Sequence, residues 1–211
     1  MNILFLHTLD SNTELFKPLA AEKFPQHNIS HDVQESFLTD IRSNGQNKLS
    51  TQIIHQYLKD KLINGFDYII CTCSTLGSVV DSFPNDKVFR VDKPMAKICA
   101  QYESILVAVT LESTIGPTRA LLTSQAPETK FKFTLIDGAW ELYEQGKFES
   151  FNDCIANDIN QTLQREQNYQ VVLLAQASMI NSASLITDTI PVLTSPDNCL
   201  AYLADHLKET P

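Results

Sequence analysis

The chain has 211 residues and a formal net charge of −9, with 43% hydrophobic and 19% charged residues. This balance is too apolar for a disordered chain, and no apolar run is long enough to span a bilayer. The negative charge disfavours nonspecific binding to nucleic acid or to an anionic membrane, because both would repel the protein. We therefore expect a soluble globular protein, built as one large domain or two small lobes.

The N-terminus and the cysteines indicate a cellular compartment. The first residues, MNILFLHTLDSN, lack the positively charged segment and the small-residue cleavage site of a signal peptide. The five cysteines are odd in number and irregularly spaced, at Cys71, Cys73, Cys99, Cys154 and Cys199. Without a secretion signal this pattern favours reduced thiols, so we expect a cytoplasmic protein without disulfides.

Short apolar runs alternate with helix-like segments along the chain, which is typical of β-α units that form a parallel sheet. The predicted strands cover residues 3–6, 68–70, 88–91, 105–109, 131–136, 171–175 and 191–193. The continuous apolarity of ILVAV and VVLLA indicates strands covered by helices on both faces. The predicted fold class is therefore α/β with parallel sheets.

The clearest helix is expected over residues 50–64. Ile54, Leu58 and Leu62 recur there every four residues, which places them on one helical face. Gly65 follows at a position where a helix C-cap favours glycine. The pattern thus predicts an amphipathic helix that ends just before Gly65.

Three further helices are expected to begin at side chains that can cap a helix N-terminus. These N-caps are Asp92, Ser113 or Thr114, and Ser195. The last is followed by a proline and an acid, both of which are favoured in a first helical turn. Each strand is thus expected to lead into a helix through a hydroxyl or an acid.

The two halves of the sequence end their strands with similar polar residues. These are His7-Thr8 and Cys73-Ser74-Thr75 in the first half, and Thr110, Thr114 and Gln176-Ala177-Ser178 in the second. Parallel α/β sheets bind ligands beyond the carboxyl ends of their strands, where helix N-termini present free N–H groups. We therefore expect two similar halves that face each other and share these residues as ligand contacts.

Cys73 is the strongest candidate for a catalytic group. It directly follows a buried strand and precedes Ser74 and Thr75, which are expected to cap the next helix. Such a position lowers the pKa of a thiol and favours the thiolate, so Cys73 is the predicted nucleophile or base. The alternative, a small buried hydrophobe, is the preferred interpretation for Cys71.

Other polar groups give weaker signals. The Cys71-Thr72-Cys73 segment has no second ligand pair nearby, so we expect no metal. His7 could bind a ligand or transfer a proton, or it could be a structural donor, and the sequence favours neither. Arg90 and Lys93 could supply positive charge, although a solvated surface pair is the preferred interpretation.

Hydroxyl groups are expected to dominate the lining of the ligand site. The residues concerned are Ser74, Thr75, Thr110, Thr114 and Ser178. The sequence has neither a dinucleotide-binding glycine fingerprint nor a Walker-type phosphate loop. Hydroxyls and helix-start N–H groups suit a carboxylate, although each hydroxyl could equally cap only its own helix.

The sequence resembles the aspartate/glutamate/hydantoin racemase superfamily, particularly its little-characterised members with an AQASM motif. The resemblance rests on LFLHT, ICTCSTLG, FRVDKPMA, VAVTLESTIGPTRALL, VLLAQASM and IPVLTSPDNCLAYL, which together span most of the chain. It implies two similar Rossmann-like lobes related by pseudo-twofold symmetry, residues 1–93 with a returning helix at 195–211, and residues 94–194. It also implies a cleft between the lobes that binds a small carboxylic acid or amino acid without a cofactor.

In family members with two catalytic thiols, one cysteine from each lobe stands on either face of the substrate α-carbon. Cys73 matches the first position, whereas Gln176 stands at the second. A glutamine cannot act as an acid or base near neutral pH. The resemblance therefore implies a single-thiol isomerase in which Cys73 is the base or nucleophile and Gln176 orients or polarises the substrate. The implied substrate contacts are His7, Ser74, Thr75, Thr110, Thr114 and Ser178.

Two alternatives stay open. Relatives with one thiol include arylmalonate decarboxylases, so a one-base decarboxylase or other lyase is a second hypothesis. In those decarboxylases, however, the retained cysteine belongs to the other lobe. A protein that kept the carboxylate site but lost catalysis together with the second thiol is the third hypothesis. The substrate, its chirality and assembly into a homo-oligomer do not follow from the sequence.

Overall fold

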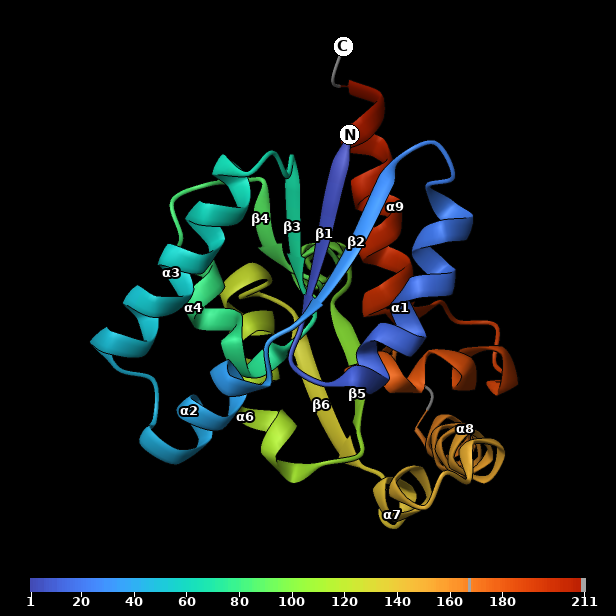
Figure 1. Ribbon diagram of the computed structural model, residues 1–211. Coiled ribbons are helices and arrows are strands. Elements are labelled where there is room, and N and C mark those ends of the chain that lie inside the picture. The colour runs from blue at the N-terminus through green and yellow to red at the C-terminus, as the bar shows by residue number, and fades with distance from the viewer. Residues whose placement is uncertain (167, 210–211) are drawn as a thin grey trace. The chain divides into compact units, whose positions relative to one another are not determined.

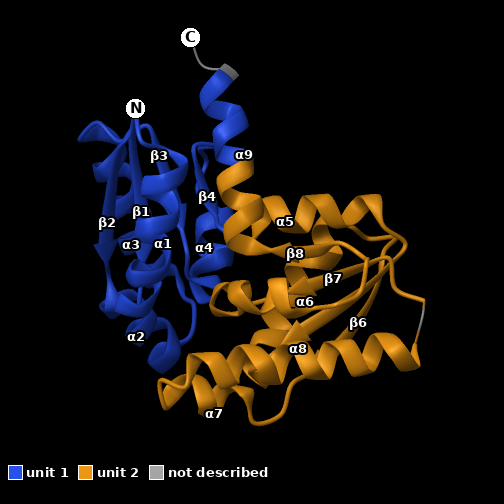
Figure 2. Cartoon of the chain, turned by 90° about the vertical axis from the view of Figure 1, so that its right-hand side faces the viewer, with its two compact units in different colours: residues 1–91, 202–211 blue, residues 92–201 orange. Residues whose placement is uncertain are grey.

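The computed structural model describes residues 1–166 and 168–209 (Figure 1). The chain divides into two compact units, coloured separately in Figure 2. Unit 1 comprises Met1–Val91 and Tyr202–Pro211, and unit 2 comprises Asp92–Ala201. No helix in the described part of the chain has both the length and the apolarity that a membrane span requires.

Unit 1 contains a four-stranded sheet in the order β2-β1-β3-β4, and all of its strand pairs are parallel. The strands are β1 (Asn2–His7), β2 (Asn28–Val33), β3 (Tyr68–Cys71) and β4 (Val88–Arg90). The helices are α1 (Asp10–Lys23), α2 (Glu35–Asn44), α3 (Lys48–Ile63), the 3-10 helix η1 (Ser74–Leu76) and α4 (Gly77–Asp81).

The two faces of the unit 1 sheet pack against different helices, because successive strand residues point to opposite sides. Leu6 and Ile69 belong to an apolar cluster that includes residues of α2, α3 and α4. On the other face, the Phe5 ring stacks on Phe16 of α1, with ring centroids 5.7 Å apart. The central strands are therefore buried on both faces, as their continuous apolar sequences predict.

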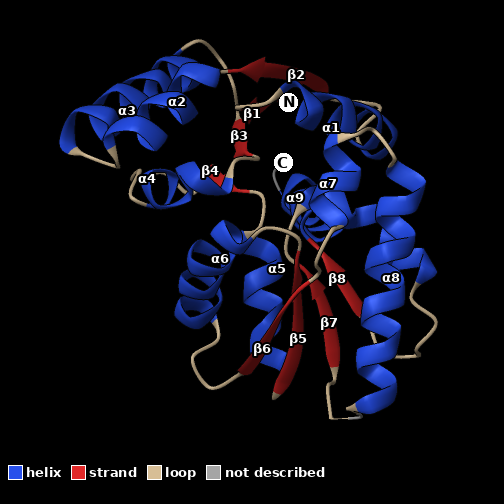
Figure 3. Ribbon diagram, turned by 90° about the horizontal axis from the view of Figure 1, so that it is seen from below, coloured by secondary structure: helices blue, strands red, loops and turns tan. Residues whose placement is uncertain are grey.

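Unit 2 contains the sheet β6-β5-β7-β8, which is also parallel throughout. The strands are β5 (Ser104–Val109), β6 (Lys130–Leu135), β7 (Val171–Leu174) and β8 (Val192–Thr194). The helices are α5 (Lys93–Ile98), α6 (Glu112–Gln125), α7 (Ala139–Glu144), α8 (Phe148–Arg165) and the 3-10 helices η2 (Cys99–Gln101) and η3 (Ala177–Leu185). Figure 3 shows α8 on one side of this sheet and α5 and α6 on the other. The last helix, α9 (Ser195–Glu209), begins in unit 2 and ends in unit 1.

The two sheets repeat each other in strand order and in register. Leu6 of β1 pairs with Cys71 of β3, and at the same place in unit 2 Ala108 of β5 pairs with Leu174 of β7. Two residues further along each strand, Thr8 becomes equivalent to Thr110 and Cys73 to Gln176. The next residue in each unit is equivalent as well. Leu9 is the N-cap of α1, Leu111 is the N-cap of α6, and both have an extended backbone conformation. The prediction of two similar α/β units with parallel sheets is confirmed.

All seven predicted strands are present, and each end lies within one residue of its expected place. The sequence did not predict β2. Its residues, NISHDV, include no continuous apolar run, and all of them are at least partly exposed. As an edge strand, β2 lacks the complete burial that marks the central strands in the sequence.

The predicted helix starts were less accurate than the strands. The helix expected over residues 50–64 is α3, which begins two residues earlier because Asn47 and Ser50 form a reciprocal capping box. Ser113 and Thr114 are not N-caps, since that position of α6 is held by Leu111. The N-cap predicted at Ser195 is wrong by one residue, because Thr194 takes that position. The hydroxyl of Thr194 accepts a hydrogen bond from the N–H of Asp197 at 3.2 Å. Asp92 does hold the N-cap position of α5, but its side chain makes no capping hydrogen bond.

Candidate functional site

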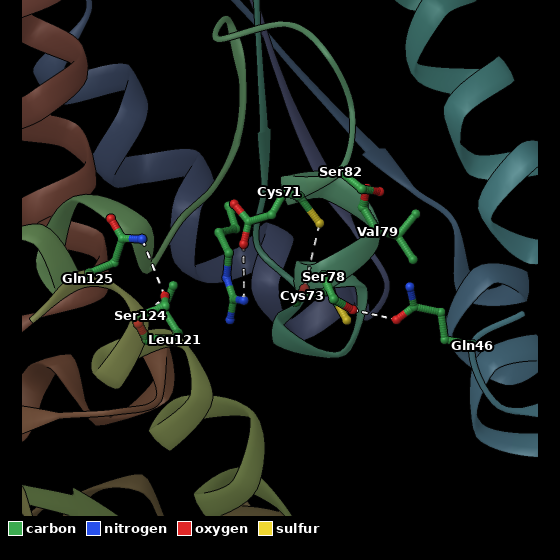
Figure 4. Close-up of polar contacts among 11 residues, drawn as sticks. Gln46, Cys71, Cys73, Ser78, Val79, Ser82, Leu121, Ser124 and Gln125 are labelled. Atoms are coloured by element: carbon green, nitrogen blue, oxygen red, sulfur yellow. Dashed lines mark hydrogen bonds and ion pairs between the residues drawn. The ribbon is translucent and has the colours of Figure 1, made fainter. Parts of the chain in front are cut away.

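Cys73 lies two residues beyond β3, at the N-cap position of η1. Its side chain is buried, 8% exposed, in the apolar cluster formed with residues of α2, α3 and α4. The Cys71 thiol donates a hydrogen bond to the Cys73 carbonyl oxygen across 3.7 Å, drawn as a dashed line in Figure 4. The strand end therefore holds the Cys73 backbone in a defined extended conformation before the helix begins.

Ser74 and Thr75 do not form the predicted cap, because both lie inside η1 and Cys73 itself takes the N-cap position without a side-chain hydrogen bond. Ser74 is exposed and Thr75 is half-buried. Nearby, the Ser78 hydroxyl of α4 donates to the carboxamide oxygen of Gln46, which ties α4 to the segment before α3 (Figure 4). A role of Ser74 and Thr75 in binding a ligand stays a prediction.

Three other cysteines, Cys99, Cys154 and Cys199, have thiols whose pKa is raised, so these thiols stay protonated near neutral pH. Burial raises the pKa of Cys99 to about 12. The pKa of Cys199 is also raised, by burial and then by the nearby charge of Asp92. Burial, followed by the charge of Asp158, raises the pKa of Cys154 as well. These three thiols are therefore poor nucleophiles, which leaves the candidates at the end of β3.

His7 is completely buried at the end of β1, with both ring nitrogens engaged. Its Nδ1 lies 2.8 Å from the Thr72 hydroxyl, and its Nε2 lies 2.9 Å from Nδ1 of His31. Because the Thr72 hydroxyl faces the Leu6 carbonyl at 3.3 Å, it donates there and accepts from His7. Burial, and then the neighbouring His31, lower the pKa of His7 to about 4, so this ring is neutral at pH 7.

Arg90 at the end of β4 does not form the expected solvated pair with Lys93. Its side chain is only 6% exposed, and its Nη1 lies 3.6 Å from Oδ2 of Asp81. The guanidinium packs against Gly77, where a Cβ atom would lie 2.3 Å from Cζ of Arg90. A buried cation therefore packs on the start of α4, and any residue larger than glycine at position 77 would force the guanidinium to shift.

In unit 2, Thr110 and Gln176 are brought together from the ends of β5 and β7. Oε1 of Gln176 accepts hydrogen bonds from the Thr110 N–H at 2.7 Å and from the Thr110 hydroxyl at 2.9 Å. The backbone N–H can only donate, so the carboxamide must turn its oxygen towards Thr110. Gln176 therefore presents its NH₂ group, a double donor, away from Thr110, and within the described chain this group has no partner.

Thr114 and Ser178 are not joined to this pair by hydrogen bonds in the described part of unit 2. Thr114 lies in the first turn of α6, where its N–H donates to the Leu111 carbonyl at 3.0 Å. Ser178 lies in η3, and both side chains are half-buried. Their predicted role as anion contacts stays a prediction. Among residues 1–166 and 168–209, no group of three His, Cys, Asp or Glu side chains is arranged to hold a metal ion.

Thr8 directly follows His7, and the sequence indicated it only as one of the polar residues at the strand ends, without a role of its own. Thr8 is 1% exposed, and its hydroxyl has no hydrogen-bond partner in the described chain. The one signal that could have identified it is the internal repeat, because Thr8 occupies in unit 1 the position of Thr110 in unit 2. Recognising that equivalence requires the register of the two sheets.

No protein-family model matches the sequence, and no curated protein sequence matches it either. Solved structures of very different sequence are nevertheless similar along nearly the whole chain. An aspartate racemase from Picrophilus torridus is 13% identical with a TM-score of 0.71, covering 98% of this chain and 94% of its own. An allantoin racemase from Pseudomonas fluorescens is 17% identical with a TM-score of 0.64, covering 99% and 91%.

An arylmalonate decarboxylase is also similar, with 9% identity and a TM-score of 0.59 over 97% of this chain and 92% of that protein. At these identities the similarity establishes the fold. The chain therefore shares the α/β fold of these racemase and decarboxylase structures, as the sequence resemblance implied.

Proposed function

We propose that the protein is a racemase-like, cofactor-independent isomerase that acts at the carbon beside a carboxylate of a small acid. Cys73 is its single thiol base or nucleophile. The substrate is a small carboxylic acid or amino acid, and the reaction takes place in the cytoplasm. The fold shared with aspartate and allantoin racemases supports the reaction class.

The observation that carries the proposal is the equivalence of Cys73 and Gln176 in the repeated unit. Both residues stand two positions beyond the third strand of their unit in chain order, and both are extended N-caps of 3-10 helices. One position supplies a thiol, and the other supplies a carboxamide that Thr110 holds in one orientation. One half of the repeated site can therefore exchange a proton, and the other can only donate hydrogen bonds.

Gln176 acts in this proposal as an oriented donor to a substrate oxygen. Thr110 occupies the carboxamide oxygen, so the NH₂ group remains for the ligand. Proton abstraction at the carbon beside the carboxylate converts this group into an enediolate, whose oxygens carry increased negative charge that such a donor stabilises. Thr110 is accordingly a positioning residue, while Ser74, Thr75, Thr114 and Ser178 are the proposed anion contacts.

Two other functions each have one observation in their favour. A one-base decarboxylase or other lyase is favoured by the similarity to arylmalonate decarboxylase. A carboxylate-binding protein without catalysis is favoured by Gln176 itself, because it removes the second acid–base group. The three functions differ in what happens to the ligand: proton exchange, loss of carbon dioxide, or neither.

The test begins with a melting-temperature screen of mono- and dicarboxylic acids, since a ligand that binds the folded state raises the melting temperature. Each hit is then incubated in heavy water. We expect deuterium at the carbon beside the carboxylate with the wild type and with Cys154→Ala, and none with Cys73→Ala of unchanged melting temperature. Release of carbon dioxide would favour the lyase, and binding without exchange would favour the non-catalytic protein. Full activity of Cys73→Ala would exclude the proposed role of Cys73.

A further inference from the structure

Unit 2 contains its own acceptor for the donors of Thr110. The Thr110 N–H and hydroxyl converge on one oxygen atom, Oε1 of Gln176, at 2.7 and 2.9 Å. Two donors that meet on one oxygen form the arrangement that binds a carboxylate or carbonyl oxygen elsewhere in proteins. The Gln176 carboxamide therefore occupies, within the chain, a place that an oxygen of a ligand could take.

Unit 1 repeats the donors without the acceptor. Thr8 is equivalent to Thr110, and its hydroxyl is buried with no partner in the described chain. No backbone or side-chain acceptor within residues 1–166 and 168–209 receives the Thr8 N–H either. The neighbouring strand end carries Cys73 in place of Gln176. The thiol sulfur is two bonds from Cα, whereas the oxygen of Gln176 is four, so Cys73 does not reach Thr8.

Thr8 and Cys73 nevertheless belong to the same face of the unit 1 sheet. Leu6 and Cys71 are paired in the β1–β3 register, and both contribute to the apolar cluster packed on α2, α3 and α4. Side chains two residues further along each strand return to the same face. Cys73 does so, since it belongs to that cluster as well. A ligand oxygen bound by Thr8 would accordingly lie on the Cys73 side of the sheet.

A buried hydroxyl without a partner is costly, and in folded proteins such groups call for an explanation. We infer that Thr8 binds one oxygen of the substrate carboxylate beside Cys73, with both its N–H and its hydroxyl donating. The backbone N–H is a donor only, so the site selects an oxygen acceptor over an ammonium group. The inference deepens the proposed function, on which it rests for the identity of the ligand.

The two alkylating reagents iodoacetate and iodoacetamide provide a probe, because they differ in carrying a carboxylate or a neutral amide. Mass spectrometry of the digested protein measures each rate separately at Cys73 and, as an internal reference, at Cys154. We expect Thr8→Val to lower the iodoacetate rate at Cys73 about tenfold relative to the iodoacetamide rate, since hydrogen bonds to charged acceptors are the stronger ones. Thr8→Ser, which keeps the hydroxyl, should retain the wild-type ratio, and the ratio at Cys154 should not change.

A stability measurement separates this role from a structural one. Thr8→Val removes an unpartnered hydroxyl, so it should not lower the melting temperature of the ligand-free protein. The matched variant Thr110→Val removes a hydrogen bond to Gln176 and should lower it. An unchanged rate ratio in Thr8→Val, or an equal fall of melting temperature in both variants, would overturn the inference. If the ratio falls but no acid undergoes proton exchange, the carboxylate subsite stands and the proposed reaction does not.

Discussion

Hydrogen bonds to Gln176 decide what this residue can contribute to a reaction. A free glutamine offers both a donor and an acceptor, but Thr110 engages the oxygen of Gln176 from two sides. The side chain is therefore restricted to donating through its NH₂ group. An amide does not titrate near neutral pH, so in the proposed function Gln176 cannot return a proton to the substrate.

His7 is the second residue whose role depends on its partners. In the sequence it could equally be a ligand contact or a structural donor. The structure places it between Thr72 and His31, with both ring nitrogens in short hydrogen bonds. Thr72 directly precedes Cys73, so His7 fixes the strand end from which the thiol projects. Direct contact between His7 and a ligand stays a prediction.

The pH dependence of His7 provides a test of this arrangement. The pKa of His7 is lowered from 6.5 to about 4, so between these values the unfolded chain binds more protons than the folded one. The free energy of unfolding should therefore fall by up to about 3 kcal/mol as the pH decreases through this window. NMR titration of the histidine rings checks the cause, since His7 should stay neutral down to about pH 5. Titration of His7 near its ordinary pKa would contradict the buried network.

At the level of elements, the turn from η1 into α4 depends on one close approach. Gly77 starts α4, and the guanidinium of Arg90 fills the space where another residue would have a Cβ atom. Arg90 has little freedom to move, because its side chain is buried and paired with Asp81. Through this contact β4 supports the helix that follows Cys73.

Gly77→Ala should therefore destabilise the protein by about 1–3 kcal/mol, because the added methyl group overpacks a buried site. Gly116→Ala is the matched control. Gly116 also lies inside a helix, α6, but no atom lies within 4 Å of its ideal Cβ position. Its effect should stay within about 1 kcal/mol. Urea unfolding of both variants measures the difference, and equal effects would contradict the close packing of Arg90 on Gly77.

The strands were predicted more accurately than the helix starts for a physical reason. Complete burial on both faces leaves a continuous apolar run in the sequence, as in β5 and β7. The edge strand β2 has no such apolar run, so the sequence did not predict it. Helix starts are harder because neighbouring hydroxyls compete for the cap: Thr194, not Ser195, accepts the hydrogen bond at the start of α9. Such choices depend on backbone conformation, which the local sequence does not determine.

At the level of the whole molecule, the internal repeat links the fold to the candidate site. The strand order and the register of the first and third strands are the same in both units, and this repeat makes Cys73 equivalent to Gln176. The sequence alone predicted Cys73 and Gln176 as a pair by resemblance. It indicated Thr8 only as a polar residue at a strand end, because the burial of its hydroxyl and its equivalence to Thr110 depend on contacts between distant segments.

The stereochemistry of proton exchange follows from having one thiol. A single base that removes and returns a proton acts on one face of the substrate carbon, whereas racemisation requires proton delivery to the opposite face. The central claim is therefore tested by incubating the protein in heavy water with one enantiomer of a chiral amino or hydroxy acid that binds it. Chiral chromatography coupled to mass spectrometry then measures deuterium in both enantiomers.

We predict that the wild-type protein incorporates deuterium into the starting enantiomer faster than it forms the opposite enantiomer, and that Cys73→Ala does neither. Formation of the opposite enantiomer as fast as exchange would contradict a single-thiol site, because it would require a second acid–base group at the substrate carbon. Exchange that persists at the wild-type rate in Cys73→Ala would contradict the role of Cys73 itself.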